Sequence, residues 1–226
     1  MLELLENLAP NVIDLYPDLL TALQETLHMV SVAGIISTLL GLPLGIILVV
    51  TRPGHIMENK WLYGIVGKFV NVLRSIPFII LLAAIIPITR LLLGTTIGIK
   101  GALVPLVFGA TPFVARQIES ALLDIDDGVI EAAESMGSSP FQIIYRVLLL
   151  EGLPGIIYAL TITTVSLIGY SAMAGTVGGG GLGDFAIRYG YQYFKTDIMV
   201  VTIILLLILV NLVQGFGEFL LKKVKH

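Results

Sequence analysis

The stretch DIDDGVIEAAESMGSSPFQ, residues 124–142, is the longest clearly polar passage between two strongly apolar ones. Its polarity indicates that it lies outside a membrane. Asp126 and Asp127 can accept hydrogen bonds from the first free N–H groups of a helix, and they place negative charge at its positive end. Gly137 stands where a left-handed residue would end the same helix. The stretch therefore predicts a short helix between Asp126 and Gly137.

A second helix is predicted directly after the glycine. Ser139 offers its N-cap, Pro140 its first position, and Gln142 the third position of a capping box. Helices this short are marginal alone, so both need something to pack against. At helical spacing the first helix has an apolar face of Val129, Ala132, Ala133 and Met136, and an opposite face of Glu131, Glu134 and Ser135. We interpret the stretch as a docking element.

The centre of this stretch resembles a motif of a known protein family. Glu131-Ala132-Ala133, followed after three residues by Gly137, resembles the EAA loop of the inner-membrane permeases of binding-protein-dependent ABC importers. In that family the loop forms the coupling helix, which sits in a groove of the cytoplasmic ATPase. The family pattern continues to a Leu-Pro pair, whereas here the proline follows one turn later, as Pro154. The resemblance implies an ATPase-coupling role for Val129, Glu131, Ala132, Ala133, Met136 and Gly137.

The composition indicates a helical membrane protein. Apolar residues make up 56% and charged residues 13%, against roughly 45–50% and 25% in soluble domains. Backbone polar groups in lipid must be paired internally, and long apolar runs without alternation favour helices over a barrel. The chain has no cysteine, so disulfides and cysteine-bound metals are excluded.

Five apolar segments are long enough to span a membrane, which takes about 20 residues each. They are about Leu23–Val50, Trp61–Leu93, Ile99–Leu123, Phe141–Ile168 and Thr196–Leu221. We therefore expect an extracytoplasmic arm at residues 1–20, a transmembrane permease domain at 21–221 with the coupling loop at 124–140, and a cytoplasmic tail at 222–226. The fold expected is all-α, of the type I ABC importer permease class.

Prolines and basic residues inside these spans predict departures from straight, uncharged helices. Pro43 predicts a kink in the first span, and Pro105 and Pro112 predict breaks in the third. Lys68 and Arg74 interrupt the second, and we favour a helix that starts inside the cytoplasm over basic residues that line the permease interior.

Small residues predict close packing in two places. Gly41 and Gly45 form a G-x-x-x-G pair in the first span, which is either a packing seam or an accident of a glycine-rich chain. Tyr170–Lys195 is predicted as a glycine-rich and aromatic-rich loop.

The basic residues favour an orientation with the N-terminus outside and the C-terminus inside. That orientation places the following near the cytoplasm: Arg52, Lys60, Arg116, Arg146, Lys222, Lys223 and Lys225. It leaves Arg90, Lys100, Arg188 and Lys195 outside. The loop with Glu-Ala-Ala then lies on the cytoplasmic side.

Motifs of other chemistries fit poorly. Gly178, Gly180 and Gly183 have the spacing of a dinucleotide-binding loop, but no strand precedes them. Gly181–Asp184 resembles the G-x-G-D of intramembrane aspartyl proteases, but the Tyr-Asp pair that those enzymes need is absent. The acidic run beginning at Asp124 lacks two oxygen ligands of a calcium loop. We expect no catalytic residue, no metal and no cofactor.

Two further sequence segments indicate which group of importer permeases the chain resembles. RSIPF at residues 74–78 resembles a signature of amino-acid importer permeases, and with IGYSAM at 168–173 the chain resembles methionine importer permeases. The resemblance implies two cytoplasmic ATP-binding ABC subunits and an extracytoplasmic substrate-binding protein. Five helices are too few to enclose a path, so we expect a second copy of the chain, in a homodimer. Membrane lipid is the remaining expected partner, and nucleic acid is not one.

The substrate path is predicted at the end of the fourth span. Small residues, an aromatic wall and a soft gate suffice to pass methionine, and the segment with that character contains Tyr170, Ser171, Met173 and Thr176. Met173 is the preferred gate because an unbranched thioether can repack around a ligand. The alternative is that these four residues pack the dimer seam.

Two other classes remain as alternatives for the whole protein. An ion-gradient-driven secondary amino-acid transporter would need ionisable residues at the midplane or repeated broken helices. A membrane enzyme would need a catalytic pair or a metal motif. The sequence shows neither set of features, which favours the importer permease.

Overall fold

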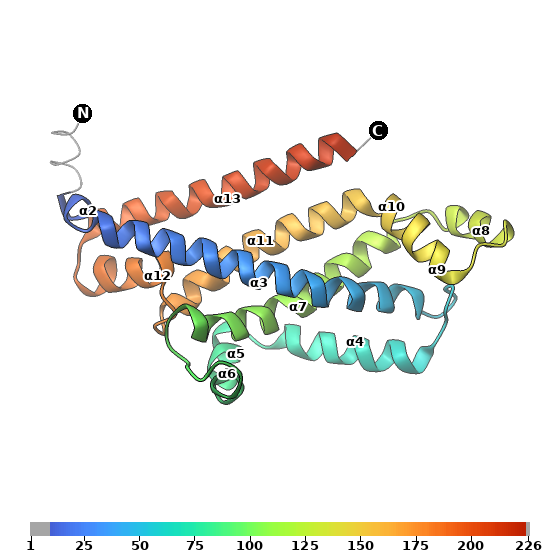
Figure 1. The fold of residues 1–226 in the computed structure, drawn as a ribbon, viewed down its shortest axis with the longest axis horizontal. Helices are drawn as coiled ribbons and strands as arrows, with labels where there is room; N and C mark the ends of the chain where they lie inside the picture. The colour runs from blue at the N-terminus through green and yellow to red at the C-terminus, as the bar shows by residue number, and fades with distance from the viewer. Residues whose placement is uncertain (1–9, 225–226) are drawn as a thin grey trace. The chain divides into compact units, whose positions relative to one another are not determined.

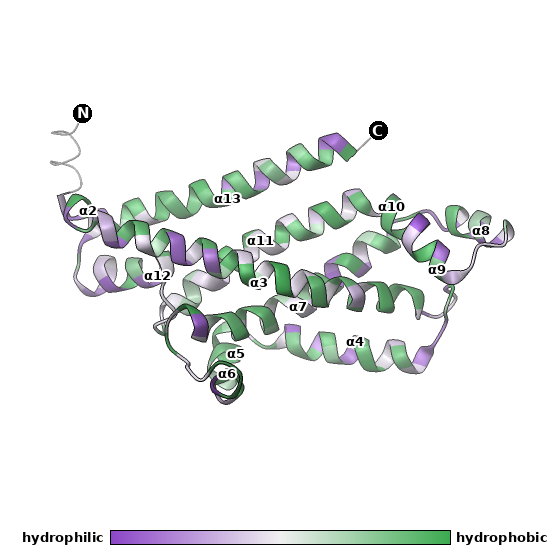
Figure 2. Cartoon of the chain, in the orientation of Figure 1, coloured by the Kyte–Doolittle hydropathy of each residue, from purple (hydrophilic) through white to green (hydrophobic). Residues whose placement is uncertain are grey.

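The computed structural model describes residues 10–224, and in this range every regular element is helical. The helices long and apolar enough to cross a membrane are α3 (Tyr16–Val50), α7 (Gly98–Leu123), α11 (Leu153–Gly175) and α13 (Thr196–Val224). α4 (Lys60–Ser75) and α5 (Phe78–Ala84) are bent at a short break and make a fifth span if they are taken together. Figure 1 shows the four long ribbons, and Figure 2 shows that they are mostly hydrophobic. The prediction of an all-α membrane protein is confirmed.

The other helices are short and form the ends and connections of the long ones. In chain order they are α2 (Pro10–Asp14), α6 (Ile86–Leu93), α8 (Asp127–Ser135), α9 (Pro140–Ile143), the π-helix η1 (Ile144–Leu148), α10 (Leu149–Glu151), α12 (Gly181–Phe185) and the π-helix η2 (Ala186–Gln192). π-helical turns are rare and are frequently found at functional sites. η1 follows the predicted coupling loop directly.

The chain forms two compact units, each built from three separate segments. Unit 1 comprises Met1–Gly34, Pro77–Val107 and Thr164–Val213, and unit 2 comprises Ile35–Ile76, Phe108–Thr163 and Gln214–His226. Four of the five boundaries fall inside α3, α7, α11 and α13, so each of these long helices contributes to both units, and the fifth falls between α4 and α5.

In unit 2 the glycine pair of α3 packs directly on α7. A Cβ atom added to Gly41 would lie 2.6 Å from Val114 Cβ, and one added to Gly45 would lie 2.7 Å from Ile118 Cβ. Carbon atoms in contact are normally about 3.5–4.0 Å apart, so only glycine allows this approach. The sequence left the role of the pair open, and the structure shows a packing seam.

In unit 1 the start of α3 packs against elements far along the chain. Leu19 and Ala22 form one buried cluster with Leu182, Phe185 and Ile198. The first residues of the described chain are tied to the same region, because Asn11 N donates to Asp197 Oδ2 at 3.0 Å. Residues 10–20, predicted as part of an arm, are therefore helical, in α2 and the first turns of α3. Residues 1–9 of that arm lie outside the described residues.

The second predicted span is more broken than expected, and the third is less broken than expected. The second is divided into α4, α5 and α6. Pro77, which cannot continue the hydrogen bonding of α4, lies at the first of the two breaks. The third, α7, is continuous, so the breaks predicted at Pro105 and Pro112 are wrong. Leu106 and Val114, close to these prolines, are fully buried, and packing of this kind holds a helix through a missing N–H group.

The predicted fourth span started too early. Residues from Phe141 form α9, η1 and α10, and the apolar helix α11 starts only at Leu153. Gly152 separates the two, and a Cβ atom there would lie 2.6 Å from the Leu148 carbonyl oxygen. Pro154 is the second residue of α11, a position where proline loses no helical hydrogen bond.

The segment Tyr170–Lys195 is mostly helical, so its prediction as a loop is wrong. α11 continues to Gly175, and a turn at residues 176–180 leads into α12 and η2. Gly178, Gly180 and Gly181 have positive φ angles of 83°, 78° and 78°, which make this tight turn possible. Asp184 consequently lies in α12 rather than in a loop.

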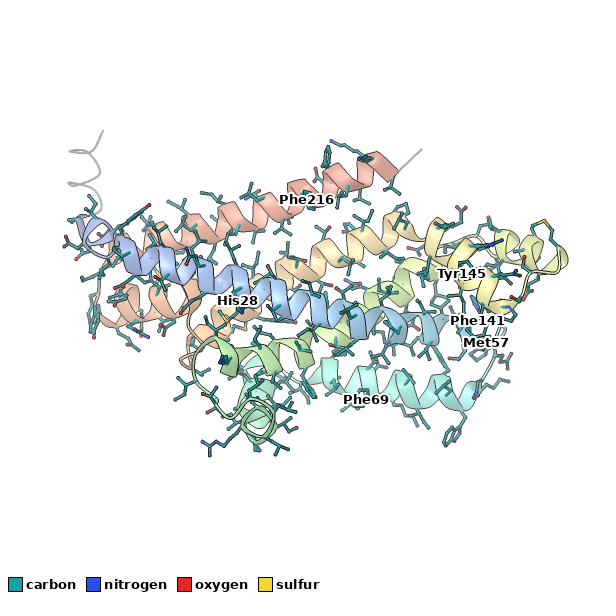
Figure 3. All side chains as sticks on the ribbon, viewed as in Figure 1. His28, Met57, Phe69, Phe141, Tyr145 and Phe216 are labelled. Carbon is teal, nitrogen blue, oxygen red and sulfur yellow. The ribbon has the colours of Figure 1, made fainter. Side chains whose placement is uncertain are left out.

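Apolar side chains remain exposed on several long helices. Phe69 on α4 and Phe216 on α13 are 57% and 64% exposed, and Figure 3 labels both. Of the four long helices, α13 has the smallest buried share of its apolar window, 11%. Such faces are ordinary for helices that lie in lipid or against a partner helix.

Candidate functional site

The first helix of the predicted coupling loop has the predicted ends. Asp126 is the N-cap of α8, and its Oδ1 accepts a hydrogen bond from Gly128 N at 2.7 Å. At the other end Gly137 has a φ of 80°. Its N–H donates to the Glu134 carbonyl at 2.9 Å, and the Ser138 N–H donates to the Ala133 carbonyl at 3.1 Å. This is the pattern of a left-handed glycine that closes a helix, so the predicted bounds are confirmed.

The second helix of the loop starts with the predicted capping box. Ser139 N donates to Gln142 Oε1 at 2.8 Å, and Gln142 N donates to Ser139 Oγ at 3.4 Å. Pro140 occupies the first helical position. The two caps fix the turn between α8 and α9 through local hydrogen bonds alone.

The faces of α8 differ in part from the prediction. Ile130 and Ala133 are buried and pack into the core of unit 2 with Val49, Ile118 and Leu148. The prediction placed Ala133 on the same face as Val129, Ala132 and Met136, with a role in coupling to the ATPase. In the structure Ala133 instead faces the core of its own chain. The inward pair has i, i+3 spacing, which was the signal available in the sequence.

The outward side of α8 remains open. Val129 and Met136 are 40% and 79% exposed, and Ala132 and Glu131 are also exposed. Val129, Ala132 and Met136 follow one another at i, i+3 and i+7, so they lie along one side of an otherwise acidic helix. We call these three side chains the α8 patch.

A polar cavity lies beside α8 within unit 2. Its volume is about 490 Å³, and its lining includes His55, Glu58, Asp127, Glu131 and Glu134. His55 comes from the connection between α3 and α4 and has a buried Nδ1 atom without a hydrogen-bond partner among the described residues. The cavity thus joins the first connection of unit 2 to the coupling loop.

Burial lowers the pKa of His55 below its ordinary value of 6.5, against the opposing pull of Asp127 and Glu134, while Arg52 lowers it further. The unfolded chain therefore takes up a proton first as the pH falls through 6.5, and the folded loop loses stability there. We expect a lower thermal unfolding midpoint below pH 6.5 than above it. His55→Gln should reduce this difference, and an unchanged pH dependence in that variant would contradict the assignment.

The four predicted path residues do not share one environment. Tyr170 stacks on Phe78 of α5, with ring centroids 4.5 Å apart. Ser171 is buried, and its hydroxyl donates to the Ile168 carbonyl at 2.8 Å. Met173 is 46% exposed and Thr176 is exposed as well. Met173 and Thr176 are therefore the most open of the four, Tyr170 is half-buried, and Ser171 is closed off.

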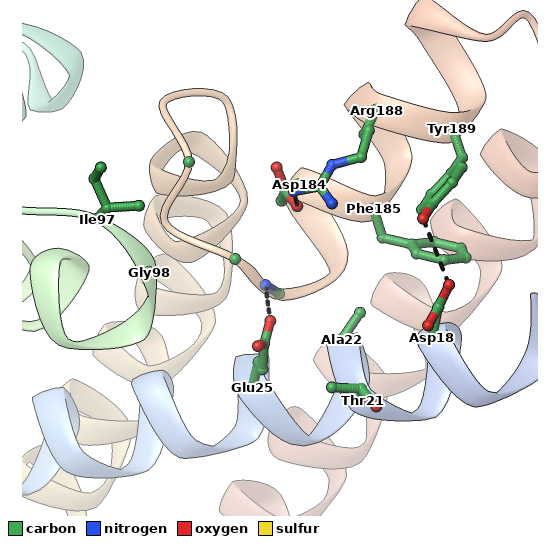
Figure 4. A pocket seen from close by; sticks show the side chains of 13 residues that line it. Asp18, Thr21, Ala22, Glu25, Ile97, Gly98, Asp184, Phe185, Arg188 and Tyr189 are labelled. Atoms are coloured by element: carbon green, nitrogen blue, oxygen red, sulfur yellow. Dashed lines mark hydrogen bonds and ion pairs between the residues drawn. The ribbon is translucent and has the colours of Figure 1, made fainter.

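A second cavity, of about 350 Å³, lies in unit 1 between α3, α12 and η2 (Figure 4). Glu25 Oε2 accepts from Gly181 N at 2.7 Å, and Thr26 Oγ1 accepts from Leu182 N at 2.8 Å. These side chains of α3 supply the caps that α12 lacks in its own sequence. Asp184, on the cavity wall, pairs with Arg188 at 2.5 Å, and burial raises the pKa of its carboxyl.

Among the described residues, no three His, Asp or Glu side chains gather as metal ligands would. The candidate site therefore consists of the capped helices α8 and α9 with the α8 patch, the polar cavity beside α8, and the exposed residues Met173 and Thr176. Over residues 41–226 the chain matches the family described as "Binding-protein-dependent transport system inner membrane component". The chain belongs to this family. The permease is accordingly an inner-membrane protein.

One similar relative covers nearly the whole permease, and another covers two thirds of it. A probable D-methionine transport system permease protein of Vibrio cholerae is 53% identical over 208 residues, which is 92% of each chain. The D-methionine transport system permease protein of Escherichia coli K12 is 54% identical over 151 residues, 67% of this chain and 70% of its own.

Solved structures agree with this similarity. A structure of the MetNI methionine ABC transporter in inward-facing conformations aligns with a TM-score of 0.92 at 48% identity, covering 94% of this permease and 99% of that chain. An amino acid ABC transporter solved with histidines aligns with a TM-score of 0.78 at 18% identity, which supports the fold alone. The predicted type I ABC importer permease fold is confirmed.

Proposed function

We propose that this permease is the membrane subunit of an ATP-driven methionine importer. The observation that carries the proposal is 53% identity over 92% of the chain to a probable D-methionine permease. The match to a methionine ABC transporter structure supports the same substrate. The permease forms the translocation path as a homodimer, and separate cytoplasmic subunits hydrolyse ATP.

The coupling loop is the contact with the ATPase in this proposal. The α8 patch of Val129, Ala132 and Met136 is apolar and open, while Ile130 and Ala133 anchor the helix to its own unit. A helix held at both caps and packed on one side transmits a push without bending. Glu131 lies beside the α8 patch, and Gly137 ends the helix. Ala133 acts by packing the helix against its own unit.

Transport assays test the proposal directly. The permease, its ATPase subunit and the cognate binding protein should together import methionine into liposomes when ATP is present on the ATPase side. L- and D-methionine should be measured separately. Uptake driven by a sodium or proton gradient without ATP would favour the secondary transporter instead. A complex without the permease serves as the control for leakage.

The proposed orientation predicts opposite labelling at the two ends of the described chain. Asp14 and Lys223 are both exposed, and the chain contains no cysteine. A cysteine at Asp14 should react with a membrane-impermeant maleimide in intact cells, whereas one at Lys223 should react only after lysis. The reverse pattern would place the coupling loop on the wrong side for a cytoplasmic ATPase.

Met173, on α11, is the proposed gate of the substrate path, and Thr176 lies three residues later, in the turn that follows this helix. The path then follows an exposed strip of this helix, and Tyr170 and Ser171 support it from behind through the stacking and hydrogen bond described above. An exposed methionine suits this role because its side chain adapts to a passing thioether.

The variant Met173→Trp should block methionine uptake while ATP hydrolysis continues, because the larger side chain closes the path. Val200→Trp on α13 enlarges a similarly exposed residue, 49% against 46%, and should leave uptake intact. Uptake is measured in liposomes and dimer content by gel filtration in detergent. Full uptake by Met173→Trp would rule out the gate, and loss of its dimer would show that the residue packs the dimer seam instead.

A further inference from the structure

One ion pair of unit 2 is buried and belongs neither to the α8 patch nor to the proposed path. Nη1 of Arg116 bonds with Oε2 of Glu119, one turn further along α7. Their side chains are only 20% and 7% exposed, whereas the ion pairs Glu58–Lys60 and Asp184–Arg188 have more exposed partners. Arg116 and Glu119 are therefore the charged pair most enclosed by the described part of the protein.

Arg116 also reaches across to α4. Its Nη2 donates to the Gly67 carbonyl at 3.2 Å and to Asn71 Oδ1 at 2.9 Å. The guanidinium lies close to the α4 backbone here, since a Cβ atom added to Gly67 would be in ordinary contact with the same nitrogen, at 3.5 Å. Beside the pair, the two helices pack through an apolar cluster that contains Val70 and Ala115. One guanidinium thus connects α7 to α4 at two points.

Stability alone does not explain this arrangement. Removing two charges from water is costly, and apolar side chains of similar volume often stabilise a fold as well or better. Arg116 Nε is buried and has no acceptor among the described residues, so the pair is not fully satisfied. A guanidinium makes directional hydrogen bonds of fixed geometry, which an apolar side chain cannot make.

We propose that Arg116 and Glu119 are positioning residues that make α4 move together with α7. This inference rests on the proposed function. Glu119 lies four residues before Leu123, where α7 ends, and α8 starts at Asp127. A displacement of the coupling loop therefore reaches the pair through one turn of α7. The hydrogen bonds to Gly67 and Asn71 then carry α4 along instead of letting it slide.

The first test replaces the pair by apolar residues, as Arg116→Met with Glu119→Leu. This variant leaves no unpaired buried charge, so the complex should assemble and continue to hydrolyse ATP. The methionine imported per ATP hydrolysed should fall about tenfold, as expected for a lost coupling between two elements. Lys60→Met, which removes an exposed ion pair of the same unit, should leave the ratio unchanged. A wild-type ratio in the double variant would overturn the proposal.

The second test does not depend on the folding of that variant. Val70→Cys and Ala115→Cys place a thiol on each helix within the shared cluster, in a chain without other cysteines. After oxidation, with the crosslink verified by mass spectrometry, the otherwise wild-type complex should import methionine at its usual ratio to ATP. The crosslink should also restore the ratio of the double apolar variant. Loss of uptake in the crosslinked wild-type background would show that α4 and α7 must separate, and would overturn the proposal.

Failure of the proposed function and failure of the proposed connection between α4 and α7 give different results. If the unmodified complex imports no methionine with ATP, the proposed function itself is wrong. If it does import methionine, the double apolar variant and the crosslink test only the connection between α4 and α7.

Discussion

Gly45→Leu is expected to prevent unit 2 from folding, so that little or no assembled permease is recovered from membranes. A Cβ atom at this position would lie 2.7 Å from Ile118 Cβ and 2.8 Å from the Ala115 carbonyl oxygen. Both obstacles are close to or part of the α7 backbone and cannot rotate away. Overpacking a core by single methylene groups already costs about 1–3 kcal/mol, and leucine adds four carbon atoms. The measurement is the monodisperse fraction on gel filtration in detergent.

A matched control separates this packing effect from the general effect of leucine for glycine in a helix. Gly215 lies in α13, and a Cβ atom there would meet nothing within 4 Å. Gly215→Leu should therefore be recovered in normal amounts. Equal recovery of both variants would contradict the close contact between α3 and α7.

Gly137→Val is expected to uncouple ATP hydrolysis from transport while the membrane part stays folded. Gly137 has a φ of 80°, and nothing lies within 4 Å of an added Cβ atom, so the cost is backbone strain of about 1–2 kcal/mol. Relief of the strain changes the turn between α8 and α9 and thereby the direction of the α8 patch. Substrate-stimulated ATP hydrolysis and methionine uptake by the purified complex measure the effect.

Gly94→Val is the control for strain itself. Gly94 ends α6 with a φ of 72° and equal free space, so both variants should lose similar thermal stability. Only Gly137→Val should lose coupling. Wild-type substrate-stimulated hydrolysis by Gly137→Val would remove this residue from the coupling loop's function.

The parts of the site that could be predicted depend on neighbours in sequence. The caps of α8 and α9 involve residues two or three positions apart, such as Asp126 with Gly128 and Ser139 with Gln142. Helix capping is decided at that range, so residue types at fixed offsets suffice. The long apolar helices could be predicted for a similar reason, since lipid requires continuous apolar length.

The parts that could not be predicted depend on distant partners. α12 forms because Glu25 and Thr26 cap it from 156 positions away, and no local signal in a glycine-rich segment announces this. The inward rotation of Ala133 depends on the apolar core that α8 meets. Likewise, Arg116 suggested only a cytoplasmic flank, and its contact with Asn71 of α4 emerges only once the two helices lie together.

The alternation of the chain between the two units has a consequence for biosynthesis. The chain passes from one unit to the other at residues 34/35, 76/77, 107/108, 163/164 and 213/214. Neither unit is complete when the ribosome has delivered any one contiguous half of the sequence, because each also needs part of α13. The glycine seam between α3 and α7 can close as soon as α7 is inserted, whereas the buried cluster of unit 1 waits for Ile198 of α13. Nascent chains arrested before α13 should therefore form the contact between α3 and α7, but leave the cluster of Leu19, Ala22, Leu182 and Phe185 without its α13 member.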